Sequence, residues 1–194
     1  NSSTAPDGTT TATKLVPTTT NGNHYSLQNI GASTSYSVYT LSFYAKATGY
    51  TALTIANTPN GYIHYDLTGV AVSTLGTGWS NATITAVSGA TGWYRCTATS
   101  SNNSSWGGLY IAVDNAFAAS GGTGFSSYAG DGTSGVYIWG VQVEVGSVAN
   151  TYVPTTTTTI YGTPTLSFNN AGQIGLQSDG SLYVSPAGTG AIQA

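Results

Sequence analysis

The sequence predicts an all-β protein, specifically an antiparallel jelly-roll β-sandwich, and three observations lead to this prediction. Segments in which apolar and polar residues alternate recur about every ten residues, as short strands do in a sandwich. No segment carries apolar residues at helical spacing. Aromatic residues make up 11% of the chain and Gly accounts for 26 of its 194 residues, so strand-forming segments alternate with turn-forming ones.

The strongest predicted strand begins at Gly135 and reads GVYIWGVQVEV before Gly146 ends it. Its apolar content favours a central position in one sheet. Because side chains of a strand alternate between its two faces, we expect the odd-numbered residues to face the core and the even-numbered ones to face away from it. The expected inward set is Tyr137, Trp139, Val141, Val143 and Val145.

The other predicted strands are short and are separated by turn signals such as Pro59-Asn60-Gly61. Two of them alternate clearly. Residues 37–47 are expected to direct Leu41 and Phe43 inward, and residues 62–67 are expected to direct Ile63 and Tyr65 inward. In chain order, the predicted strands are 11–17, 23–30, 37–47, 50–56, 62–67, 70–75, 82–88, one beginning at 92, 109–113 and the strand described above.

The composition changes after Pro154, where a run of five threonines is followed by short apolar stretches between Asn-, Asp- and Gly-containing turns. Such a segment has too few apolar residues to fold alone. We therefore expect a jelly-roll domain over residues 1–157 and a linker with a short-stranded oligomerisation segment over residues 158–194.

Charge and cysteine content exclude several classes of protein. The net charge is −3, and Lys14, Lys46 and Arg95 are too few to form the basic cluster that nucleic-acid binding requires. No stretch approaches the ~18 apolar residues of a membrane span, so no membrane insertion is expected. Cys96 is the one cysteine, which excludes an internal disulfide and favours a small buried apolar role.

Candidate ligand-binding residues are found in two settings. Trp79 and Trp106 lie in polar, Gly-containing stretches, where an indole ring beside Asn and Ser side chains could stack on a sugar or could instead cap the edge of the sandwich. Tyr62, His64 and Asp66 share one face of a predicted strand and could line a groove, although His64 could equally be a surface residue.

Three acids are candidate ligands of a structural Ca²⁺ ion, which binds oxygen atoms in loops. Asp7 in PDGT and Asp131 in GDGT could instead form turns with their own backbone. Glu144 could be a third ligand, or it could accept backbone N–H groups at the strand end. No catalytic residue is assigned, because the acids show no pairing within a strand and the histidines lack a nucleophile elbow, so the protein is not expected to be an enzyme.

Three stretches carry a family resemblance: APDGTTTATKL at 5–15, GWYRCTAT at 92–99 and GDGTSGVYIWGVQVEVGSVANTYVPT at 130–155. They resemble the carbohydrate-binding-module-like, lectin-type jelly rolls of bacteriophage tail fibres and other appendages. The resemblance implies a non-catalytic structural or appendage module of the virion that contributes to recognition of a host-surface glycan and contacts other virion proteins. It also implies a structural calcium ion, since related modules often hold one.

The tail GSLYVSPAGTGAIQA is similar to segments that lead into trimeric fibre stalks, which implies a homotrimer. Two alternatives remain open. One is a carbohydrate-binding module of a secreted bacterial glycoside hydrolase, and the other is a polysaccharide depolymerase whose carboxylate pair comes from distant strands.

Overall fold

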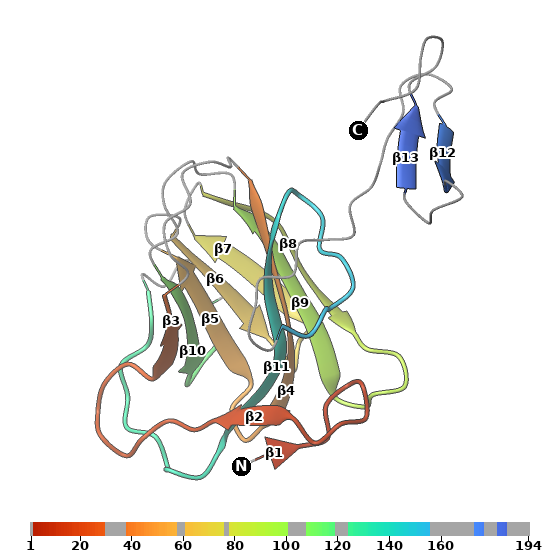
Figure 1. The fold of residues 1–194 in the computed structure, drawn as a ribbon. Helices are drawn as coiled ribbons and strands as arrows, with labels where there is room; N and C mark the ends of the chain where they lie inside the picture. Colours follow the sequence, from red (N-terminus) through yellow and green to blue (C-terminus); the bar gives the residue numbers. More distant parts are fainter. Residues whose placement is uncertain are drawn as a thin grey trace. The chain divides into compact units, whose positions relative to one another are not determined.

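Two antiparallel sheets pack against each other, which confirms the predicted antiparallel β-sandwich (Figure 1). The structure is a computed structural model that describes residues 2–29, 38–57, 61–75, 78–100, 108–118, 124–155, 173–176 and 182–185. These residues contain no helix, and so none that is long and apolar enough to cross a membrane. The chain divides into two units, 1–154 and 155–194, whereas the sequence predicted a division after residue 157.

The first sheet is six-stranded and has the order β1-β2-β11-β4-β9-β8. The second is five-stranded and has the order β3-β10-β5-β6-β7. Both sheets place strands from distant parts of the chain side by side. The bounds are β1 Ser2–Ser3, β2 Ala12–Leu15, β3 Tyr25–Gln28, β4 Tyr39–Thr48, β5 Ala52–Asn57, β6 Gly61–Asp66, β7 Ala71–Leu75, β8 Trp79–Ala86, β9 Trp93–Ser100, β10 Leu109–Asp114 and β11 Gly135–Val145.

The core lies between the sheets and is built from alternate residues of each strand. Leu41 and Phe43 of β4 and Ile63 and Tyr65 of β6 are all fully buried, which confirms the inward sets predicted for these two strands. The ring of Phe43 meets that of Tyr65 edge to face at 5.5 Å, and the Tyr65 hydroxyl donates to the carbonyl of Thr97 on the opposite sheet. Burial raises the pKa of the Tyr65 phenol well above its ordinary value, so the ring stays neutral.

Cys96 of β9 is fully buried in the same core. Burial raises the pKa of its thiol far above the ordinary range, because the apolar surroundings disfavour the thiolate. The predicted role of Cys96 as a small buried apolar residue is confirmed.

The facing predicted for β11 is wrong for every residue of the expected inward set except Val143, since Val141 and Val145 are 40% and 56% exposed. Val136 and Ile138 face the core, at 0% and 7% exposure, while Tyr137 and Trp139 face outward. A bulge between Trp139 and Gln142 then shifts the pairing with β4. An extra residue at a bulge reverses the alternation, so Val143 beyond it packs against the core.

Gly140 makes the bulge possible. Its φ of +60° is one that L side chains rarely adopt, and a Cβ atom there would lie 3.1 Å from the Tyr44 ring. Because the sequence pattern was extended straight through Gly140, it assigned the wrong face to the residues before it. The central position of β11 is as expected, since β2 and β4 lie on its two sides.

In the second unit, β12 Gln173–Leu176 pairs with β13 Leu182–Ser185 in a two-stranded antiparallel sheet. The pair Ile174 and Val184 are directly opposite each other. The apolar residues Leu166 and Phe168 of the same segment lie outside the described residues.

Candidate functional site

Small side chains line the outer face of β5, the face turned away from the core. The pairing register places Ala56 between Tyr62 of β6 and Tyr110 of β10. Thr54 is the next residue of β5 on this face, and Ala52 follows it, between Asp66 of β6 and Asp114 of β10. Ala52, Thr54 and Ala56 are only 2%, 0% and 6% exposed even though they face outward, so other groups cover them.

A segment from the long Gly-, Ser- and Ala-rich loop lies on this face. It comprises residues 124–128, and Asn23 holds it by donating from Nδ2 to the carbonyls of Phe125 and Ser126. At its end, Tyr128 exchanges backbone hydrogen bonds with Gly22, and its hydroxyl donates to the carbonyl of Val113 at 2.8 Å. The segment is therefore anchored at both the backbone and the side chains.

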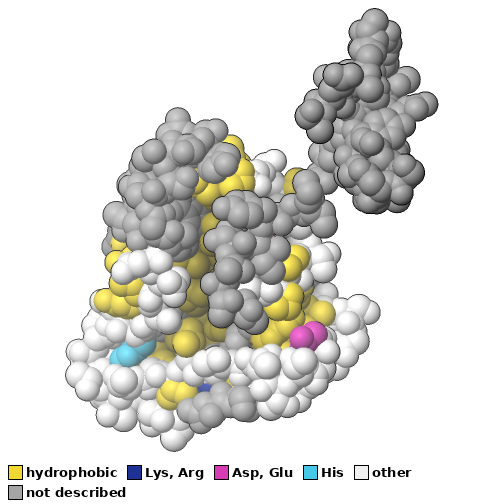
Figure 2. All heavy atoms as spheres, in the orientation of Figure 1, with side chains coloured by type: hydrophobic (Ala, Val, Ile, Leu, Met, Phe, Trp, Pro, Cys, Tyr) yellow, Lys and Arg dark blue, Asp and Glu magenta, His cyan; other side chains and the backbone are white. Residues whose placement is uncertain are grey.

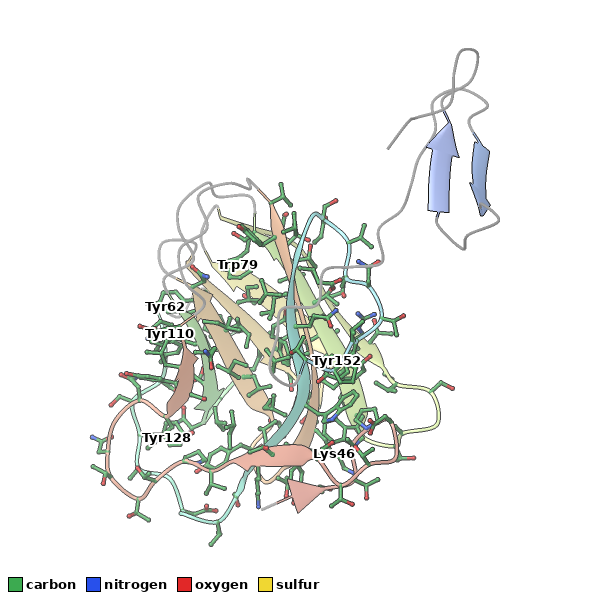
Figure 3. All side chains as sticks on the ribbon, viewed as in Figure 1. Lys46, Tyr62, Trp79, Tyr110, Tyr128 and Tyr152 are labelled. Atoms are coloured by element: carbon green, nitrogen blue, oxygen red, sulfur yellow. The ribbon has the colours of Figure 1, made fainter. Side chains whose placement is uncertain are left out.

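Four aromatic rings meet where this segment crosses the sheet, and we call them the aromatic surface: Tyr25, Tyr62, Tyr110 and Phe125. The Phe125 ring is stacked on Tyr25 at 5.5 Å, meets Tyr62 edge to face at 5.5 Å and lies 5.9 Å from Tyr110. Tyr25 is 51% exposed and the other three rings are partly exposed. Tyr62 and Tyr110 lie next to each other on the side of the sandwich that carries β3 and β10 (Figure 3).

A chain of polar groups fixes the segment to the sheet. Oδ1 of Asp114 accepts from the Ser126 backbone N–H at 3.0 Å and from the Ser126 hydroxyl at 2.7 Å. Oδ2 of Asp114 accepts from the Thr54 hydroxyl. Since that hydroxyl has one proton, it must accept from Nδ1 of His64, which lies 2.6 Å away and therefore carries a proton. Thr54, His64 and Asp114 are at most 3% exposed, so this network is part of the interior and not a ligand contact.

Charged groups are sparse on the sandwich, where hydrophobic atoms occupy much of the visible face (Figure 2). All three Lys and Arg residues of the chain belong to the six-stranded sheet: Lys14 to β2, Lys46 to β4 and Arg95 to β9. Figure 3 shows Lys46 on that sheet, away from Tyr62 and Tyr110. The outer face of the five-stranded sheet has two acids, Asp66 and Asp114, and no Lys or Arg.

The first alternative given for Trp79, an indole ring that could stack on a sugar, is wrong. Trp79 begins β8 opposite Ser100, and its side chain is 6% exposed within the core cluster. Its Nε1 donates to the carbonyl of Gly61 at 3.1 Å, which satisfies its polar end. The ring is therefore not available to stack on a sugar. Trp106, the second tryptophan of that prediction, lies outside the described residues.

Tyr62, His64 and Asp66 share the outer face of β6, as the alternation predicted, but they do not line a groove together. Tyr62 belongs to the aromatic surface. His64 is buried at 2% exposure in the network described above, so neither role that the sequence allowed for it applies. Asp66 accepts from the backbone N–H of Thr68 at 2.8 Å and so stabilises the turn between β6 and β7.

Two of the three candidate calcium ligands form turns. Oδ1 of Asp7 accepts from the backbone and the hydroxyl of Thr9, and Oδ1 of Asp131 accepts from the backbone N–H groups of Thr133 and Ser134. Hydrogen bonds lower the pKa of both carboxyl groups. The largest contribution comes from the Thr9 side chain at Asp7 and from the Ser134 side chain at Asp131, and the backbone N–H groups add to it.

Glu144 binds a different part of the chain. Its two carboxylate oxygens accept from the backbone N–H and the side-chain amide of Asn150, at 3.0 and 2.9 Å. No group of three or more His, Cys, Asp or Glu side chains among the described residues could hold a metal ion. Asp7, Asp131 and Glu144 therefore do not form one calcium site, and that expectation is corrected.

The segment that follows β11, residues 146–155, folds back over the outer face of the six-stranded sheet. Arg95 donates to the Asn150 carbonyl and lies over the ring of Tyr44. The Tyr152 ring meets that of Trp139 edge to face at 4.6 Å. The motif residues at 139–152 thus hold the returning chain against this face, where Tyr44, Tyr137 and Trp139 are partly buried.

Sequence reasoning missed most of the aromatic surface. Tyr25 and Tyr110 lay in predicted strands, but their neighbours across the sheet could not be known without the strand order. Phe125 offered one signal, because it is one of three aromatic residues, with Phe117 and Tyr128, in a loop that otherwise consists mostly of small ones. A scan against protein-family models found no match to this chain, and neither did a search of the curated proteins.

Proposed function

We propose that residues 1–154 form a non-catalytic binding module of a bacteriophage appendage, with jelly-roll connectivity, and that the module contacts a glycan of the host surface. The aromatic surface carries this proposal. Tyr25, Tyr62, Tyr110 and Phe125 come from three strands and a loop, and they meet on an outward face where they fill no core. A cluster of partly exposed rings on a rigid sheet is a typical recognition surface.

The chemistry of such a surface suits a sugar. One face of a pyranose ring consists mainly of C–H groups, which pack against the flat face of an aromatic ring. The hydroxyl groups of Tyr25, Tyr62 and Tyr110 supply polar atoms at the ring edges, where sugar hydroxyls lie. Leu27, which is directly opposite Tyr110 on β3 and is 44% exposed, extends the apolar area.

A binding role is also supported by the hydrogen bonds that the acidic side chains make within the protein. Asp7, Asp66 and Asp131 stabilise turns, Glu144 binds the returning chain and Asp114 is buried in the network with Ser126. Each of these described carboxylates already has hydrogen-bond partners that explain its position without a substrate.

The proposal extends to the virion. We propose that residues 158–194 bring three copies of the chain together, that the module is part of an extracellular appendage and that other virion proteins adjoin it. The resemblance of residues 130–155 to phage appendage domains and of the tail to stalk-forming segments supports this part.

A glycan array probed with the full chain and with Tyr110→Ala tests the proposal. We expect binding of the full chain to at least one glycan, weakened about tenfold or more by Tyr110→Ala, since removing one stacked ring forfeits about 1–3 kcal/mol. Tyr137→Ala, at a partly exposed tyrosine of the other sheet, is the matched control and should bind normally. Equal weakening in both variants, or none in Tyr110→Ala, would reject the aromatic surface as the site.

A further inference from the structure

We infer that the aromatic surface selects an uncharged saccharide and discriminates against glycans that bear carboxylate or phosphate groups. The inference rests on the proposed function and adds the chemical class of the ligand. It follows from where this chain places its few charges.

An anionic sugar would find no cation at the aromatic surface. The chain has only three Lys and Arg residues, and all of them lie on the other sheet. The segments 30–37, 58–60, 101–107 and 119–123, which lie outside the described residues, contain no charged side chain in the sequence. Two of the three cations are moreover engaged: Lys14 donates to the Thr133 carbonyl at 2.7 Å and Arg95 to the Asn150 carbonyl.

The histidines do not supply the missing charge. Nδ1 of His24 accepts from the Thr18 backbone N–H at 3.3 Å, so that nitrogen carries no proton and its Nε2 donates to the Tyr128 carbonyl at 2.8 Å. Both ring nitrogens of His24 are therefore engaged within the protein. His64 is 2% exposed beneath the surface and binds Thr54, so it offers no contact to a ligand.

The same face carries negative charge. Asp114 accepts three hydrogen bonds, two from Ser126 and one from Thr54. Asp66 lies on the same row of the sheet, with Ala52 between the two acids. A carboxylate or phosphate brought to this face would lose water without gaining a counter-charge and would be repelled by both acids.

The opposite sheet shows what an acidic ligand would need. Lys14 and Lys46 lie directly on either side of Tyr137, on the outer face of β2, β11 and β4. The two faces of the sandwich thus differ in sign, and the aromatic surface is on the face without cations. A ligand of the aromatic surface must be held by stacking and neutral hydrogen bonds.

Matched pairs of glycans test the inference, each pair differing only in a CH₂OH or a carboxylate at C6 of the sugar, such as glucose and glucuronate oligomers. Binding of the full chain is measured at low and at high salt. We expect the neutral member to bind at least tenfold more tightly, with an affinity that salt leaves unchanged. Tyr110→Ala should weaken that binding about tenfold or more, and Lys46→Gln should leave it intact.

A gain-of-charge variant sharpens the test. Leu27→Lys places a cation opposite Tyr110, and Leu27→Gln is its matched control. We expect Leu27→Lys alone to improve binding of the acidic member at least threefold at low salt, without a change for the neutral one. No improvement in Leu27→Lys would count against the inference.

The outcomes separate the two claims. Tighter binding of the acidic member, lost in Tyr110→Ala, would overturn the inference and leave the proposed function standing. Binding of an acidic glycan that Lys46→Gln abolishes and Tyr110→Ala spares would overturn the proposed function, because the ligand would then occupy the other sheet. Binding to no glycan of either kind would overturn both.

Discussion

Ser126 donates two hydrogen bonds to a single oxygen of Asp114, one from its backbone and one from its hydroxyl. Asp114 is the last residue of β10, and Ser126 directly follows Phe125, so this contact fixes the height at which the Phe125 ring lies over the sheet. The aromatic surface is therefore built by a loop that is attached to buried polar groups. Loss of the attachment should affect both stability and ligand binding.

The first prediction concerns Asp114→Asn. An amide places an N–H donor where an oxygen now accepts, so at least one buried hydrogen bond is lost and the free energy of unfolding should fall by about 1–3 kcal/mol. Urea denaturation measures it. The control is Asp66→Asn, which keeps the oxygen that accepts from Thr68 and should be nearly neutral. If the two variants are equally stable, the network at Asp114 has no structural role.

The second prediction concerns Trp79. Because its ring is buried in the core, Trp79→Ala should lower the free energy of unfolding by about 3–5 kcal/mol. Trp79→Phe should retain the fold, lose less stability and bind glycan as the unaltered chain does. A Trp79→Phe protein that melts normally but no longer binds would show that the indole contacts the ligand after all.

The third prediction concerns acid stability. The pKa of Asp131 is lower in the folded protein than in the unfolded chain, where an aspartate has a pKa of about 3.9. Its carboxylate therefore stabilises the fold at all pH values above that unfolded pKa, and this contribution is lost as the pH falls from there toward the folded pKa. Asp7 is shifted in the same direction and should add to the effect.

Urea unfolding between pH 2 and 6, a range chosen to span the aspartate pKa of about 3.9, measures this dependence. Asp131→Asn should make stability fall less steeply below about pH 4 than in the unaltered chain. An unchanged slope would mean that the turn at Asp131 forms equally well when its carboxyl group is protonated.

The fourth prediction concerns assembly. Light scattering on the full chain should give three times its 19.7 kDa, whereas a chain ending at Thr159 should be monomeric. The shortened chain retains the first unit, residues 1–154, and should still bind glycan, though with the weaker affinity of a single site. A monomeric full chain whose tail is readily proteolysed would refute the trimer.

The sequence was sufficient for the sandwich because its strands β4 and β6 alternate without interruption. Leu41 and Phe43, like Ile63 and Tyr65, could be assigned to the core from the period of two alone. The same reasoning failed at β11, where the bulge at Gly140 reverses the faces of the strand. A glycine inside a strand pattern can indicate a bulge, but the pattern does not reveal on which side of it the alternation still holds.

The candidate site was harder to predict because it depends on tertiary contacts. Trp79 follows Gly78 and precedes polar residues, so it looked like part of a loop until its pairing with Ser100 placed it in a strand. Phe125 reaches Tyr25 and Tyr110 only because residues 124–128 lie across β5, whose small side chains leave room. Neither the strand order nor the path of a loop can be read from local sequence.

The central claim is that the aromatic surface of the five-stranded sheet binds the ligand, and NMR mapping tests it most directly. The full chain, labelled at Phe and Tyr, is titrated with the neutral glycan that the array identifies. The account predicts that the largest shift changes occur at Tyr25, Tyr62, Tyr110 and Phe125, with Tyr137 unaffected. Shift changes concentrated at Tyr137, beside Lys14 and Lys46 on the other sheet, would contradict it.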